Sequence, residues 1–411
     1  MILVSAPFSA TQKSLISQSR TKHRQNLQIE DVSQRTPLLM TPGPTEVGQQ
    51  VLDALSQRPM LHYGEKWRVF YSSTLELMRK IFEAASDDQI ILVPAPGSVA
   101  MEMAVANLAK PGEKILNLRN GYFGEVFKIC AELHGIKVIE PEVPYGTPVP
   151  VREVRRLLEE NKDLSAVTVV HNETSGGVLN PVQDIGDLAN EFGVPLIVDT
   201  ISSFGAVRTP VQKWNCAICV GYPSKGLAGV PGATPVAIKR EIWDKYSQKQ
   251  IENLGRFLSF AVWDHYIREW GSMGHPFPTT MPTSVIQALA VAAQVALDEG
   301  LDARTERHRW VSAKCRKMVR EMGLDILPEE SVASSTVTAA KLADPSQDGV
   351  RAIMEKEFGI TISGGLSLLR GKILRIGHMG LTATDPCVER TVTALKKSFE
   401  IQSKVVSARA S

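Results

Sequence analysis

Short apolar runs alternate with amphipathic segments from residue 90 to residue 239, and this alternation constrains the fold most. The apolar runs are expected to be strands, at 90–94, 114–118, 137–140, 166–170, 195–198, 216–220 and 235–239. Segments with apolar residues at helical spacing lie between them, at 101–109, 123–134, 151–161 and 182–192. Such alternation is typical of a mostly parallel, doubly wound α/β sheet. Ligands bind such sheets at the carboxyl ends of the strands.

The pattern changes after about residue 240, which indicates a second domain. Residues 240–271 are expected to form a long helical region, which a proline-rich stretch at 276–282 ends. Helices at 284–299 and 305–322 then precede short strands and helices up to residue 407. We therefore expect an N-terminal arm or targeting segment at 1–35, a large domain at 36–275 and a smaller α+β domain at 276–411.

Charge and hydropathy argue against nucleic-acid and membrane partners. The 46 Lys and Arg residues nearly balance the 44 Asp and Glu residues, giving a net charge of +2. No run of about 18 apolar residues predicts a transmembrane helix. Residues 1–29 lack Asp and Glu, which is typical of a mitochondrial transit segment and equally of a docking arm. The compartment stays open between cytoplasm, mitochondrion and peroxisome.

Two of the five cysteines, Cys216 and Cys219, have the CxxC spacing of redox and metal sites. They lie inside an apolar run, and no second CxxC or nearby histidine pair follows. The pattern therefore favours core packing, and we predict no metal site. The odd, scattered set of cysteines indicates reduced thiols in an intracellular protein.

A carboxylate and an amine follow neighbouring apolar runs. Asp199 ends the run at 194–198, and Lys225 follows the run at 216–220. This pair is what pyridoxal 5′-phosphate (PLP) requires, because a lysine forms a Schiff base with its aldehyde and a carboxylate pairs with its protonated ring nitrogen. Two unrelated polar residues at strand ends would look the same, so further parts of a site are needed.

The turn after the first strand supplies a candidate phosphate site. Gly97 and Ser98 stand before a predicted helix, where backbone N–H groups bind anions and glycine permits close approach. An ordinary helix cap has the same pattern. Phe123 and Thr174 also follow apolar runs, so all these candidates are expected at one edge of the sheet.

At this point the chain resembles the class V aminotransferases of PLP fold type I. The similarity is to the branch of alanine–glyoxylate, serine–glyoxylate and 2-aminoethylphosphonate–pyruvate aminotransferases. The matching segments occur in family order, together with Lys225: TPGP at 41–44, GS at 97–98, NGYFG at 120–124, HNETSGGV at 171–178, VD at 198–199, GVPG at 229–232, TMP at 280–282 and RIGHMG at 375–380. They span roughly residues 36–400.

The resemblance implies a large domain with the mostly parallel sheet, a smaller C-terminal α+β domain, and a role for each residue toward the cofactor. Lys225 would form the Schiff base and then move the substrate proton, and Asp199 would pair with the ring nitrogen. Further contacts would come from Phe123 by stacking on the ring, from Thr174 near the ring oxygen, and from Gly97, Ser98, Val99 and Ser224 around the phosphate. The usual residue before the lysine is an amide, and a serine hydroxyl makes fewer hydrogen bonds.

The resemblance also implies residues for the substrate and for a partner subunit. Arg375 would bind the substrate carboxylate, for which a guanidinium fork is suited; a structural ion pair is the alternative. Gly43, in the PGP loop, would approach the same carboxylate. Thr280 would reach the phosphate of a second subunit, which implies a homodimer with shared active sites.

The expected function is transfer of an amino group from alanine or serine to glyoxylate or pyruvate, with PLP bound at Lys225. The alternative is a 2-aminoethylphosphonate–pyruvate aminotransferase, because GVPG is closer to that branch and RIGHMG to the alanine–glyoxylate branch. A desulfurase or lyase is less favoured, since the loop at 361–368 has no cysteine. An inactive relative is less favoured because Lys225, Asp199 and Arg375 are all present. A nicotinamide enzyme would need GxGxxG after the first strand, which is missing.

Overall fold

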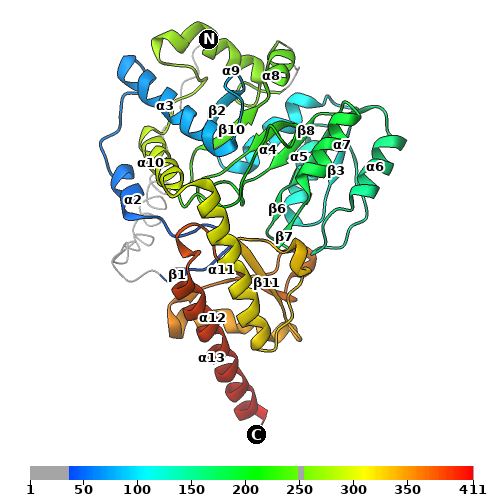
Figure 1. The fold of residues 1–411 in the computed structure, drawn as a ribbon, viewed down its shortest axis with the longest axis vertical. Coiled ribbons are helices and arrows are strands. Elements are labelled where there is room, and N and C mark those ends of the chain that lie inside the picture. Colours follow the sequence, from blue (N-terminus) through cyan, green and yellow to red (C-terminus); the bar gives the residue numbers. More distant parts are fainter. Residues whose placement is uncertain (1–36, 249–253, 411) are drawn as a thin grey trace, which may run out of the picture. The chain divides into compact units, whose positions relative to one another are not determined.

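The computed structural model of the protein describes residues 37–248 and 254–410 (Figure 1). The expected N-terminal arm or targeting segment, 1–35, lies outside the described residues. A seven-stranded sheet holds the centre of the larger part of the fold. Its strands in spatial order are β2 (Gln89–Val93), β10 (Thr234–Ile238), β9 (Cys216–Val220), β8 (Leu196–Asp199), β5 (Leu164–Val170), β3 (Lys114–Leu118) and β4 (Lys137–Ile139).

The sheet confirms the predicted α/β class. Only β10 runs antiparallel to its neighbours, and the strands from β9 to β4 are all parallel. Helices α4 and α5 pack against each other, as do α6 and α7 (Figure 1). The helices of this part are α2 (Gln49–Leu55), α3 (Glu65–Phe82), α4 (Gly97–Leu108), α5 (Tyr122–Leu133), α6 (Val151–Glu160), α7 (Val182–Glu191), α8 (Arg240–Ser247), α9 (Phe260–Trp270) and α10 (Thr283–Glu299).

Two helix boundaries differ from the sequence expectation. Helix α4 begins at Gly97, four residues before the predicted start, because Pro96 is extended and takes the N-cap position. Pro96 O accepts a hydrogen bond from Val99 N at 3.0 Å, so the Gly-Ser turn is itself the first helical turn. The expected long helical region at 240–271 contains two helices, α8 and α9. Helix α8 ends at Ser247, and Gly255, before α9, has a φ of +75°, which is outside the right-handed helical region.

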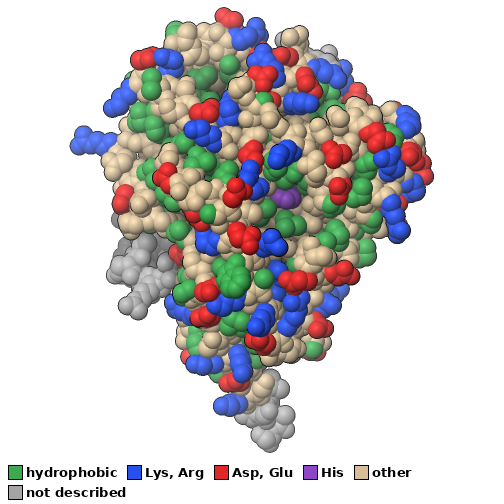
Figure 2. All heavy atoms as spheres, viewed as in Figure 1, with side chains coloured by type: hydrophobic (Ala, Val, Ile, Leu, Met, Phe, Trp, Pro, Cys, Tyr) green, Lys and Arg blue, Asp and Glu red, His purple; other side chains and the backbone are tan. Residues whose placement is uncertain are grey.

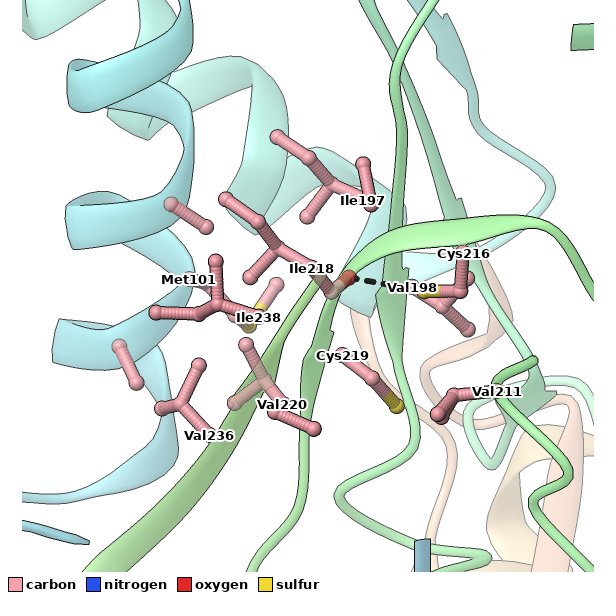
Figure 3. Close-up of a cluster of buried hydrophobic side chains, with 14 of the residues drawn as sticks. Met101, Ile197, Val198, Val211, Cys216, Ile218, Cys219, Val220, Val236 and Ile238 are labelled. Carbon is pink, nitrogen blue, oxygen red and sulfur yellow. Dashed lines mark hydrogen bonds between the residues drawn. The ribbon is translucent and has the colours of Figure 1, made fainter. Parts of the chain in front are cut away.

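The core is built on both faces of β9 (Figure 3). Cys216 and Cys219 are both buried there as free thiols, which confirms the core-packing interpretation. The Cys216 thiol points to Ile218 O at 3.1 Å. In the described part of the chain, no group of His, Cys, Asp and Glu side chains has the arrangement of a metal site.

A second apolar cluster belongs to the C-terminal part of the chain. Its main elements are α11 (Leu301–Glu321), β11 (Val337–Lys341), α12 (Val350–Phe358), β13 (Ser363–Gly364), β14 (Ile373–Gly377) and α13 (Asp385–Ala410). Strands β11, β14 and β13 form an antiparallel sheet. Strand β1 (Leu38–Leu39) pairs with β12 (Ile360–Thr361), so residues near position 38 join this part. The domain boundaries remain a prediction.

The visible face of the protein carries both signs of charge interspersed (Figure 2). Among the described helices, none taken singly has the length and apolar character needed to cross a bilayer. Helices α10 and α11 meet these criteria only when counted together, and they are bent by 84° relative to each other.

Candidate active site

Four adjacent parallel strands bring the candidate residues to one edge of the sheet. Asp199 is the last residue of β8, and Lys225 follows β9, the next strand. Thr174 follows β5, and Phe123 stands in the first turn of α5 after β3. The carboxyl ends of parallel strands share an edge, so the expected grouping is present.

Lys225 is held at this edge by the loop at 41–44. Its Nζ donates a hydrogen bond to Pro42 O at 2.9 Å and lies 5.2 Å from the centroid of the Phe123 ring. Gly43 has a φ of +117°, and a Cβ there would lie 3.0 Å from Lys225 Cε. Burial lowers the pKa of the Lys225 ammonium to about 8, although the Asp199 charge opposes this. Lys225 is therefore closer to neutral than an ordinary lysine. The structure thus places Gly43 directly against this lysine.

Asp199 is a buried carboxylate that forms no ion pair within 4.0 Å among the described residues, although the Lys225 charge acts on it. Ile201 N donates a hydrogen bond to its Oδ1 at 2.7 Å, and no other described residue donates one. Burial raises the pKa of the Asp199 carboxyl to about 7, with the Ile201 hydrogen bond opposing the rise. A protonated ring nitrogen beside Asp199 would supply the missing positive charge.

A free hydroxyl and a free helix terminus lie at the same edge. Thr174 Oγ1 is buried and has no hydrogen-bond partner in the described chain. Gly97 packs closely against the loop that follows β8, because a Cβ here would lie 2.8 Å from Ile201 Cγ1 and would force that side chain to shift. Ser98 is exposed and Val99 half-buried, and no described residue accepts a hydrogen bond from the Gly97 or Ser98 N–H. An anion could use these donors.

Arg375 lies on β14 and reaches the site from the C-terminal part. Its Nε donates to Gly364 O at 2.8 Å and its Nη1 to Thr174 O at 3.3 Å. Burial lowers the pKa of the Arg375 guanidinium to about 10, and the Glu173 charge opposes this. Within the described residues no carboxylate lies within 4.0 Å of it, so the ion-pair alternative finds no partner. The guanidinium keeps its charge available for a ligand.

Two of the predicted cofactor residues are placed differently. Ser224 is buried and its hydroxyl hydrogen-bonds to Tyr222; burial raises the pKa of the Tyr222 phenol, and this bond opposes the rise. Thr280 is exposed and makes no hydrogen bond in the described part of the chain. Within a single chain, Thr280 therefore has no hydrogen bond to Lys225 or Ser98.

Glu173 is a site residue to which the sequence assigned no role. It is fully buried, and its Oε2 accepts hydrogen bonds from Phe123 N at 3.0 Å and Gly124 N at 3.1 Å. Its Oε1 accepts a bond from Ser175 N at 3.0 Å. Glu173 thereby caps α5 and fixes the backbone that carries Phe123. Burial raises the pKa of its carboxyl, and these hydrogen bonds oppose the rise. The available signal was a carboxylate soon after the apolar run at 166–170.

The profile of the aminotransferase class-V family matches residues 38–380. The chain belongs to this family. An uncharacterized aminotransferase of Methanocaldococcus jannaschii is 33% identical over 376 residues, covering 90% of this chain and 95% of its own length. The pyridoxamine–pyruvate transaminase of Mesorhizobium japonicum is 31% identical over 360 residues, covering 87% and 90%. The crystal structure of an alanine–glyoxylate aminotransferase from Nostoc sp. matches with a TM-score of 0.85 at 27% identity, covering 92% of this chain and 98% of that one.

Membership of the class V aminotransferases confirms the resemblance, the PLP fold type I architecture and the enzyme class. The family depends on PLP, and the site fits that cofactor. Among the residues that the structure describes, Asp199 has no ion pair, Thr174 has an unused buried hydroxyl, and the start of α4 has unused N–H donors. These are the partners that a protonated ring nitrogen, a ring oxygen and a phosphate need.

Proposed function

We propose that this class V aminotransferase moves the amino group of alanine or serine to glyoxylate or pyruvate. The observation that carries the proposal is the buried guanidinium of Arg375, which has no paired carboxylate in the described chain. It donates a hydrogen bond to Thr174 O, at the edge of the sheet where Lys225 lies. Both the donor and the acceptor of such a reaction carry an α-carboxylate, which a guanidinium binds through two hydrogen bonds. The similarity to a pyridoxamine–pyruvate transaminase and to an alanine–glyoxylate aminotransferase supports small 2-oxo acids as acceptors.

The residues around PLP have separate tasks. Asp199 keeps the ring nitrogen protonated, and Phe123 supports the ring face. Thr174 Oγ1 would donate to the ring oxygen, and the N–H groups of Gly97 and Ser98 would hold the phosphate; the Val99 N–H is already bonded to Pro96 O. When bound, PLP supplies an electron sink that stabilises negative charge at the substrate α-carbon.

Lys225 Nζ is the attachment point and then the proton carrier. A pKa of about 8 leaves a useful fraction of the amine neutral near neutral pH, where it can take a proton from the α-carbon. Gly364 O and Thr174 O fix the Arg375 guanidinium, so the substrate carboxylate is held in one orientation. Arg375 on β14 thus orients the substrate carboxylate, and Lys225 in the segment after β9 transfers the proton.

The proposal includes a homodimer in which Thr280 completes the phosphate site of a second copy. Its exposure supports this, since an exposed hydroxyl in a proline-bounded segment is free to serve a neighbouring chain.

The test begins with the attachment of PLP. The protein is incubated with PLP and reduced with borohydride, and its peptides are analysed by mass spectrometry. The cofactor mass is expected on the Lys225 peptide in the parent and in the control Lys110→Ala, which changes an exposed lysine, and is expected to vanish in Lys225→Ala. Cofactor mass on another lysine would refute the assignment.

The substrate test uses the loss of the visible absorbance when amino donors are added singly. Alanine or serine should react, and Arg375→Lys should raise the KM for alanine by roughly tenfold or more while borohydride still fixes PLP to Lys225. A reaction with 2-aminoethylphosphonate but with neither amino acid would replace the proposal by the phosphonate alternative.

A further inference from the structure

A cavity of about 650 Å³ lies beside Arg375 in the C-terminal part of the chain. Its walls come from residues at the start of α12 and from the segment 361–371, which includes β13 and the glycine-rich stretch that follows it. We propose that this cavity binds a second anionic group, a carboxylate or a phosphonate, on one of the two substrates. The inference rests on one part of the proposed function, the binding of an α-carboxylate by Arg375, and it widens the substrates beyond alanine, serine, glyoxylate and pyruvate, which carry no second anionic group.

The charge of the cavity wall favours an anion. Three arginines and one aspartate line it: Arg351, Arg370, Arg375 and Asp348. Arg351 is neutralised by Asp348, to which its Nε donates a hydrogen bond at 2.8 Å. Arg370 is exposed and forms no ion pair with any residue of the described chain. Arg370 and Arg375 are therefore two guanidinium groups without an ion pair among the described residues.

Two adjacent glycines, Gly364 and Gly365, allow the segments that carry Arg351 and Arg370 to pack close to Arg375. Gly364 O accepts the hydrogen bond from Arg375 Nε, and a Cβ on Gly364 would lie 3.3 Å from Arg351 Cζ. A Cβ on Gly365 would collide with Leu369 O and lie 3.1 Å from Arg370 N. Side chains at these two positions would push both arginine-bearing segments away from Arg375. The pair of glycines thus permits a basic cluster around one end of β13.

The size and lining of the cavity fit an extended small substrate. About 650 Å³ falls inside the range of roughly 300–1,000 Å³ that small-molecule sites occupy. The Ser363 hydroxyl also lines it, has no hydrogen-bond partner among the described residues and can donate to an anionic oxygen. The Thr361 and Ser367 hydroxyls line it too, but they donate to Glu355 and Glu125, each at 3.4 Å. The substrate class is an amino acid or 2-oxo acid that carries a second acidic group beyond its α-carboxylate. Alanine and pyruvate would leave this cavity to water.

The test compares three ligands that differ only at one carbon. Propionate, succinate and 3-phosphonopropionate carry hydrogen, carboxylate and phosphonate at the same position. Their affinities for the PLP-loaded protein are measured by calorimetry at constant ionic strength. Succinate or 3-phosphonopropionate is expected to bind about tenfold more tightly than propionate, the factor that one charge-assisted hydrogen bond contributes. Which of the two binds better identifies the second anionic group.

Arg370→Ala should abolish this preference while leaving propionate binding unchanged. Arg152→Ala is the control, because Arg152 is an exposed arginine on α6 with no ion pair in the described chain. Equal binding of all three ligands to the parent would overturn the inference, as would an unchanged preference in Arg370→Ala or an equal loss in Arg152→Ala. An active aminotransferase without the preference refutes only this inference. A preference without amino transfer from any amino acid refutes the proposed function instead.

Discussion

Asp199→Asn is expected to stabilise the protein without PLP and to weaken PLP binding. Without the cofactor, Asp199 is a buried carboxylate with one hydrogen bond from Ile201 N and no paired cation in the described chain. Asparagine has nearly the same shape and can accept the same hydrogen bond through its Oδ1. It removes the buried charge, and with it the group that attracts a protonated ring nitrogen.

The size of the effect follows from the pKa. Burial raises the pKa of the Asp199 carboxyl from 3.8 to about 7. Between these pH values the folded protein holds a proton that the unfolded chain has lost, so stability falls as pH rises. One pKa unit corresponds to about 1.4 kcal/mol, so the penalty is about 4 kcal/mol at pH 8 and less than about 2 kcal/mol at pH 5. For a chain of this size, about 4 kcal/mol corresponds to roughly 5 °C in Tm.

The assay is thermal unfolding of the cofactor-free parent and variant between pH 5 and pH 8. The Tm of Asp199→Asn should exceed that of the parent by an amount that grows with pH. The control Asp87→Asn neutralises an exposed carboxylate and should show no such growth. PLP affinity of Asp199→Asn should fall by roughly thirtyfold or more, from the loss of a buried charge pair.

Two results would refute this reasoning. A variant that is no more stable than the parent at pH 8 would show that Asp199 carries no burial penalty. A more stable variant with unchanged PLP affinity would show that the carboxylate is not the partner of the cofactor.

Two further predictions concern the same edge of the sheet. Without PLP, Lys225 should be acylated with an apparent pKa of about 8, since burial disfavours its charged form; mass spectrometry across pH checks this, with exposed Lys110 as reference, and a profile centred near 10.5 would contradict it. Gly97→Ala should cost about 1–3 kcal/mol of stability and weaken PLP binding, because its Cβ would press on Ile201 and shift α4. The control is Gly48→Ala, whose added Cβ would make only an ordinary van der Waals contact. Equal unfolding midpoints and equal PLP affinities in the two variants would refute the close packing of Gly97 against Ile201.

The sequence determined the sheet and the residues at its edge. Strand and helix periods are local properties, and the carboxyl ends of neighbouring parallel strands must share an edge. Asp199, Lys225, Phe123 and Thr174 could therefore be grouped before any contact was known. The types of Asp199 and Lys225 then pointed to PLP, because its aldehyde needs an amine and its ring nitrogen a carboxylate. The roles of Phe123 and Thr174 toward PLP came from the resemblance to class V aminotransferases.

The tertiary structure decided what depends on contacts between distant segments. Arg375 donates to Thr174 O, 201 residues earlier in the chain, and Glu173 caps the helix of Phe123, 50 residues before it. No local pattern in the sequence predicts either contact. The lack of an ion pair for Asp199 among the described residues and the grouping of Arg370 with Arg375 likewise arise from packing. Charge balance and burial at a site belong to the folded surroundings, so composition and spacing alone could not supply them.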